Sequence, residues 1–201
     1  MTARLSALFA ATALAVLFAG APATRGQGLG QGFQLNPFSQ YYENVARAAK
    51  QNNTDLVRSL VGNNGNPNQV DEEGRAALHY AAINDNQMMI LILVKGGAKL
   101  DIKDRLGNTP LHLAADGNQL AAAKELLDIG ALVDSENKDG MTPLMMAANR
   151  GNVEIVQALL TKGASVTKTD YTGRDAAGWA AESHRPAVVQ AIKRAQSAKK
   201  S

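Results

Sequence analysis

Few side chains in this sequence are of a type that does chemistry. It contains three histidines and no cysteine, so thiolate metal sites and cysteine nucleophiles are excluded. His79 and His112 stand at matching places in two similar stretches of sequence, and His184 lies beside Arg185 and Pro186. None belongs to an H-E-x-x-H sequence, and no G-x-S-x-G or Walker sequence is present. We therefore predict no catalytic residue, no metal site and no cofactor.

A group of glycines and a pair of methionines are of residue types that occur in ligand sites. The glycines of residues 26–32 alternate with other residues but form no G-x-G-x-x-G and follow no predicted strand, which argues against a phosphate site. Met145 and Met146 are soft ligands that suit copper or an adaptable partner surface. Filling of the protein core is the favoured interpretation of both methionines.

The elements that position these residues follow from an internal repeat. Four glycines recur at one constant interval, namely Gly74, Gly107, Gly140 and Gly173. An alanine pair follows seven and eight positions after each glycine, and the same register places Ala48 and Ala49 in a first, degenerate unit. Because self-similarity at a period of about 33 residues indicates a repeat architecture, we predict five units. Their approximate ranges are 38–70, 71–103, 104–136, 137–169 and 170–195.

Each unit contains signals for a turn and two helices. Asp104 and Gly107 illustrate the turn, in which a side-chain acceptor precedes a residue that tolerates positive φ. Thr109 and Pro110 suit the cap and first position of a helix, and apolar residues at helical spacing then form a second helix that ends at a glycine such as Gly130. The second helix of unit two is unusual, because residues 88–94 are all apolar.

These residues resemble the ankyrin repeat. Residues 109–115 read T-P-L-H-L-A-A, as the first helix of that family does, and residues 152–160 match its second helix. The resemblance covers roughly residues 41–195. It implies an all-α solenoid of about five helix-turn-helix units joined by hairpin loops, with His79 and His112 bonded to the neighbouring loop. It also implies a module that binds proteins and is not an enzyme.

The two ends of the sequence differ from the repeats. Arg4, an apolar run from Leu5 to Ala19 and the small residues up to Ala23 predict a cleaved signal peptide over residues 1–23. An uncleaved N-terminal anchor is the rival interpretation. Residues 24–37 form a Gly/Gln-rich leader, and residues 196–201 form a basic tail. We therefore expect a periplasmic or secreted protein without a membrane anchor after cleavage.

The hairpin tips are the candidate binding site. Their charges alternate in sign and the formal net charge is only +3, so no one-signed stripe for nucleic acid is expected. Apolar side chains on turns instead favour a protein partner, bound by a monomer through the tips and the concave first-helix face. The predicted contacts are Glu72, Glu73, Arg75, Arg105, Leu106, Asn108, Lys138, Asp139, Met141, Tyr171 and Arg174, with Leu106, Met141 and Tyr171 as one apolar patch.

Two functions fit this site. One is an inhibitor or immunity-type chaperone of an enzyme of the cell envelope. The alternative is a structural or stress-protective envelope component without a single dedicated partner.

Overall fold

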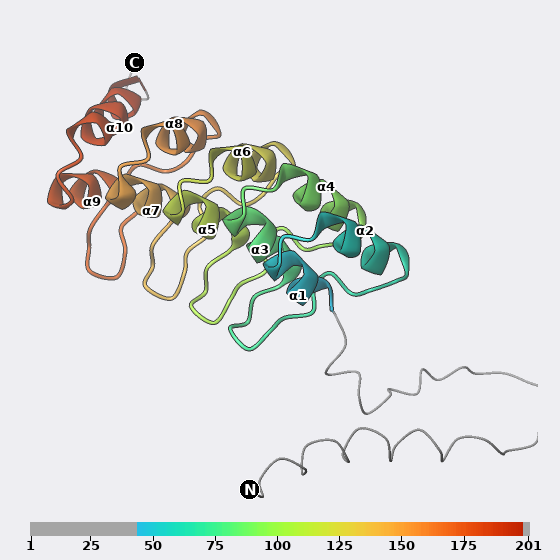
Figure 1. Ribbon diagram of the computed structural model, residues 1–201. Coiled ribbons are helices and arrows are strands. Elements are labelled where there is room, and N and C mark those ends of the chain that lie inside the picture. Colours follow the sequence, from blue (N-terminus) through green and yellow to red (C-terminus); the bar gives the residue numbers. More distant parts are fainter. Residues whose placement is uncertain (1–43, 199–201) are drawn as a thin grey trace, which may run out of the picture. The chain divides into compact units, whose positions relative to one another are not determined.

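The computed structural model describes residues 44–198, which belong to one compact unit (Figure 1). The predicted signal peptide and leader lie outside the described residues. The described part contains ten helices in five pairs. The first helices of the pairs are α1 (Val45–Lys50), α3 (Ala77–Ile83), α5 (Pro110–Asp116), α7 (Pro143–Arg150) and α9 (Ala176–Glu182). The second helices are α2 (Thr54–Gly62), α4 (Gln87–Lys95), α6 (Leu120–Asp128), α8 (Val153–Thr161) and α10 (Pro186–Ala198).

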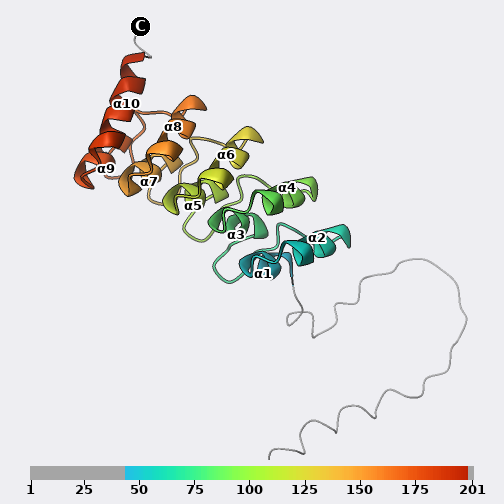
Figure 2. The same ribbon diagram turned by 45° about the horizontal axis from the view of Figure 1, so that its top comes forward.

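The helices form two layers. Each first helix packs against the first helix of the next unit, and each second helix packs against the next second helix (Figures 1 and 2). Four long loops join consecutive units and project from the first-helix layer on one side (Figure 1). The described part thus has only helices, turns and one isolated bridge, which confirms the predicted all-α solenoid. None of its helices is long and apolar enough to cross a membrane.

The core contains small apolar residues where helices touch and large apolar residues between the units. The alanine pairs of the first helices, such as Ala114 and Ala115, are fully buried and let neighbouring helices approach closely. Leu111 and Leu144 fill the space between units and are also buried. Met145 is buried and Met146 packs against the same core, which agrees with the interpretation of both as core residues.

The helix ends follow the signals in the sequence. Thr142 caps α7 by accepting a hydrogen bond from the backbone N–H of Met145, and Pro143 occupies the first turn. Gly130, just after α6, has φ of 96° and accepts the left-handed conformation that closes a helix. The last helix runs to Ala198, past the predicted end of the repeats at residue 195.

Both the backbone conformation and the close packing of the hairpin tips require glycine at position 107. Gly107 has φ of 80°, a conformation that L side chains rarely adopt. A Cβ atom at this position would also lie 2.8 Å from the backbone nitrogen of Lys138 in the next tip. Glycine therefore allows both the turn and the close approach of consecutive tips.

Replacing Leu111 by alanine tests the assigned core. The side chain is buried between units, so Leu111→Ala should lower the free energy of unfolding by about 2–5 kcal/mol. Urea denaturation followed by circular dichroism measures this value. Leu106→Ala is the matched control, because Leu106 is 62% exposed and its loss should change stability by less than about 0.5 kcal/mol. Equal effects of the two changes would contradict the assignment.

Candidate binding surface

Each hairpin tip is a turn closed on an Asp or Asn side chain. At Asp104 the backbone N–H donates to the carbonyl of Asn108 at 3.0 Å, and Gly107 N–H donates back to Asp104 at 2.9 Å. One carboxylate oxygen of Asp104 also accepts from the N–H groups of Leu106 and Asn108. The same pattern recurs at Asp71, Asn137 and Asp170. The tips are therefore built from local hydrogen bonds and need no strand.

Consecutive tips are tied to one another through the backbone. At each step one N–H donates to a carbonyl of the preceding tip: Arg105 to Glu73 at 3.1 Å, Lys138 to Leu106 at 3.0 Å, and Tyr171 to Asp139 at 3.1 Å. The four tips thus form one row with a fixed spacing, which we call the tip row (residues 71–75, 104–108, 137–141 and 170–174).

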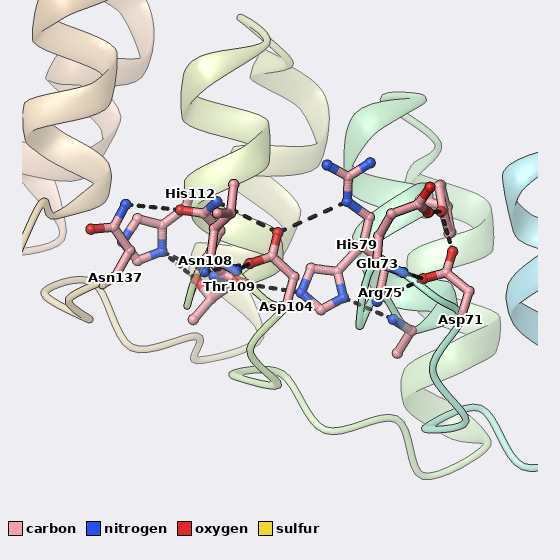
Figure 3. A network of polar contacts seen from close by, with 12 residues as sticks. Asp71, Glu73, Arg75, His79, Asp104, Asn108, Thr109, His112 and Asn137 are labelled. Carbon is pink, nitrogen blue, oxygen red and sulfur yellow. Dashed lines mark hydrogen bonds and ion pairs between the residues drawn. The ribbon is translucent and has the colours of Figure 1, made fainter. Parts of the chain in front are cut away.

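Side chains strengthen the first part of the tip row (Figure 3). Arg75 Nε lies 3.9 Å from a carboxylate oxygen of Asp104 in the next tip. Asn108 accepts a hydrogen bond of 3.0 Å from the side-chain amide of Asn137, again one tip further on. These polar contacts run from unit two to unit four, so the tips do not move independently.

The two buried histidines hold the tip row against the helices. His79 Nε2 lies 3.0 Å from the carbonyl oxygen of Asn108, and His112 Nε2 lies 3.0 Å from that of Met141 (Figure 3). A carbonyl only accepts, so each Nε2 carries a proton. Each Nδ1 accepts from a backbone N–H, that of Ala76 or Thr109 respectively. Both rings are therefore neutral, and the expected structural hydrogen bond to the neighbouring loop is confirmed.

Burial determines the acid–base properties of these rings. It lowers the pKa of His112 to about 4 and also lowers the pKa of His79. A proton added at Nδ1 of His112 would face the N–H of Thr109, so the protonated ring loses its acceptor function. His184, in contrast, is exposed in the turn between α9 and α10.

The predicted contact residues fall into three classes of exposure. Seven are exposed on the tip row: Glu72, Glu73, Arg105, Leu106, Lys138, Asp139 and Tyr171. Arg75, Met141 and Arg174 are half-buried. Asn108 is only 5% exposed and its side chain is bonded to Asn137, so the expectation of an exposed contact at this position is wrong. The polar network of the tips uses the side chain instead.

The three predicted anchors do not occupy equivalent positions. Leu106 and Tyr171 are 62% and 75% exposed, but Met141 is partly buried and packs against the core. Leu106 follows its turn residue by two positions, Met141 by four and Tyr171 by one. The ring of Tyr171 lies over Gly140 of the preceding tip, where an added Cβ would meet it at 2.7 Å. The structure therefore supplies two exposed apolar side chains at the tips and not one patch of three.

A second row of side chains follows the first helices. It comprises Tyr80, Leu113, Met146 and Trp179, which follow one another at the interval of the repeat. The hydroxyl of Tyr80 lies within hydrogen-bond distance of the Asp71 and Glu73 carboxylates, and Trp179 Nε1 donates to Asp170 at 3.0 Å. The row thus faces the tips, and Leu113, Met146 and Trp179 are partly exposed. The constant interval between these four residues is the sequence signal from which this row could have been predicted.

Charges on the tip row are only partly paired. Lys50 lies 3.5 Å from Glu73, and Arg174 pairs with Glu182 at 2.5 Å while lying over the ring of Trp179. Within residues 44–198, Glu72, Arg105, Lys138 and Asp139 have no ion-pair partner. No group of three or more His, Asp or Glu in this part of the chain is arranged to hold a metal. The surface therefore offers both charge and apolar area.

Acidification tests the role of His112. A native pKa of about 4 against 6.5 means that the unfolded chain binds the proton more readily between these values. The neutral His112 ring therefore makes its full contribution to the free energy of unfolding above about pH 6.5. This contribution, about 3 kcal/mol in total, is lost as the pH falls to about 4. Urea denaturation at a series of pH values measures it. His112→Gln should flatten this dependence and the exposed-residue control His184→Gln should not; identical slopes would refute the assignment.

Comparison with known families agrees with this geometry. The sequence matches the family of ankyrin repeats (3 copies) over residues 45–137 and 119–200. No curated protein matches the chain. The matched ranges together span nearly all described residues, including the tips, the histidines and both helix layers. The chain therefore belongs to the ankyrin-repeat family, whose repeats typically serve as non-enzymatic modules for protein–protein interaction.

Proposed function

We propose that this protein binds one partner protein through the tip row and the partly exposed side chains of the first helices. The observation that carries the proposal is the tip row itself, in which backbone bonds fix exposed side chains at a regular spacing. A surface that is already ordered loses little conformational entropy on binding. The binding unit is a single chain, because one chain supplies the whole surface.

The chemistry of the surface supports a protein partner over nucleic acid. Among the residues that the structure describes, the cations Arg105 and Lys138 have no ion-pair partner, and neither do the anions Glu72 and Asp139 on the same row. Phosphate backbones favour surfaces of one sign, whereas protein interfaces combine apolar anchors with charges of both signs. Leu106 and Tyr171 supply the apolar anchors.

We further propose that the partner is an enzyme of the cell envelope, which this protein inhibits or protects. The support is the tip row, because a preordered surface with both charged and apolar side chains is suited to covering another protein's site. A structural or stress-protective role without a dedicated partner is the second candidate. Capture from an envelope fraction, followed by mass spectrometry, separates the two, because one enriched enzyme favours inhibition and a diffuse set favours the structural role.

The proposal places the protein in the periplasm or outside the cell. It rests on the sequence of residues 1–23 and on the absence of cysteine, which fits a protein that uses no disulfide in an oxidising compartment.

Export has a direct test. Expressed in a Gram-negative host, the protein should appear in the soluble periplasmic fraction, because the apolar run of residues 5–19 is shorter than the roughly 20 residues of a membrane span. N-terminal sequencing should give Thr24 as the first residue. Full-length protein recovered from membranes would instead support the uncleaved anchor.

Binding through the tip row is tested by truncating its exposed residues. Leu106→Ala and Tyr171→Ala should each weaken binding to the captured partner by about 1–2 kcal/mol, because apolar anchors usually carry most of the affinity. Met141→Ala should lower stability as well, since Met141 packs on the core. Surface plasmon resonance with thermal melts of each variant separates these effects.

Charge changes and the opposite helix layer provide controls. Arg105→Ala should act mainly on the association rate and its salt dependence. Glu154→Ala and Gln157→Ala, exposed on α8 in the second-helix layer, should leave binding unchanged. The reverse outcome, with binding lost only in the α8 variants, would place the partner on the other side of the solenoid.

A further inference from the structure

Helix α4 has an apolar residue at a position where the other second helices have polar ones. The position of Leu91 recurs once in every unit, and the other four units have the exposed residues Arg58, Lys124, Gln157 and Gln190 there. Met88, one turn earlier, is 56% exposed, and the equivalent residues are the charged Asp55 and Glu154 and the small Ala121 and Ala187. The departure therefore concerns one unit and lies on its outer side.

These residues add a second apolar stripe to α4. The inward stripe consists of Met89, Ile90 and Leu93, which are completely buried. Met88 and Leu91 lie outside the core cluster, and Ile92 is only partly buried against it. A helix that is apolar on all sides is normally covered on all sides. On the outward stripe, which we call the α4 patch (Met88, Leu91 and Ile92), Met88 is exposed and the other two side chains are partly exposed.

Charged side chains lie on both flanks of the α4 patch. Helices α2 and α6 lie on its two sides (Figure 2). On α2, Asp55 pairs with Arg58 at 3.0 Å, and both side chains are largely exposed. On α6, Lys124 and Asp128 are exposed and Glu125 is half-buried, and Asp128 pairs with Lys162 of α8 at 2.8 Å. The α2 flank therefore carries one acid and one base and has no net sign.

We propose that the α4 patch binds the α4 patch of a second copy of this chain. A two-fold axis across the helices places α4 antiparallel on its counterpart, with α2 facing α2 and α6 facing α6. Antiparallel pairing reverses the order of charges along each flank. Asp55 then meets Arg58 of the other copy. The apolar stripe and the α2 flank are thus complementary to themselves, as an isologous interface requires.

The size of the surface sets the strength of this dimer. A helix of nine residues is about 14 Å long, and three helices about 9 Å apart span about 27 Å. The resulting area of about 400 Å² is smaller than the roughly 800 Å² that each partner buries in a typical stable complex. The dimer is therefore reversible and depends on concentration. It leaves the tip row free, so it is independent of the proposed function.

A membrane surface fits the α4 patch less well. Binding to anionic lipid is favoured by basic residues around an apolar stripe. Here the acids Asp55, Glu125 and Asp128 outnumber the bases Arg58 and Lys124 on the two flanks.

Sedimentation velocity tests self-association from low micromolar to millimolar protein. The wild-type protein should shift from monomer to dimer as concentration rises. Leu91→Lys, which introduces the residue type found at this position in unit three, should weaken association at least ten-fold. Gln157→Lys is the matched control, since it makes the same residue at the equivalent position of α8 and should not change association. Thermal melts of both variants exclude unfolding as the cause.

Charge changes on α2 test the antiparallel arrangement itself. Arg58→Glu makes this flank wholly acidic and Asp55→Lys makes it wholly basic. Each variant alone should dimerise at least several-fold more weakly than the wild type, because like charges then face each other. An equimolar mixture should regain wild-type association as a heterodimer.

Three outcomes would overturn the proposal. These are a wild-type protein that remains monomeric over the whole range, a dimer that Leu91→Lys leaves intact, and a mixture of the charge variants that associates no better than either variant alone. Flotation with vesicles of phosphatidylglycerol and phosphatidylethanolamine tests whether the α4 patch binds a membrane surface instead. Lipid binding that requires Leu91, in a protein that does not self-associate, would assign the patch to a membrane surface and likewise overturn the proposal.

Discussion

Each helix pair in this chain buries its apolar residues only against the pairs beside it. Leu111 and Leu144 lie between units, and the alanine pairs allow the first helices to touch. One unit alone would leave these surfaces in water, so no unit is stable by itself. The repeat period, the two helix layers and the spacing of the tips all follow from this stacking. It also explains why contacts remain between neighbouring units.

Polar contacts add order to this apolar stack. The buried imidazoles of His79 and His112 connect a first helix to the next tip, and Asn108 and Asn137 connect one tip to another. Buried polar groups of this kind stabilise a structure only when all their hydrogen bonds are made. Met145 takes the place of a third histidine, so no imidazole bonds to the tip of unit five. The backbone bond from Tyr171 to Asp139 and the hydrogen bond from Trp179 Nε1 to Asp170 hold this tip.

The two layers of the solenoid present different surfaces. The first-helix layer and the tip row combine fixed backbone with exposed apolar and charged side chains, which suits recognition of another protein. In the second-helix layer, Leu91 of α4 takes the position that holds an exposed polar residue in the other four units. We propose a partner protein for the first of these surfaces and a second copy of the chain for the other.

The amino-acid sequence alone predicted the fold and the role of His79 and His112, because both follow the period of the repeat. It also placed the tips correctly, since the Asp-x-x-Gly pattern acts through hydrogen bonds within a single turn. Exposure was decided by the tertiary structure. Asn108 and Met141 occupy turn positions in the sequence, yet contacts with the next tip and with the core bury them. Such contacts join residues of different units, and their geometry depends on how the units stack.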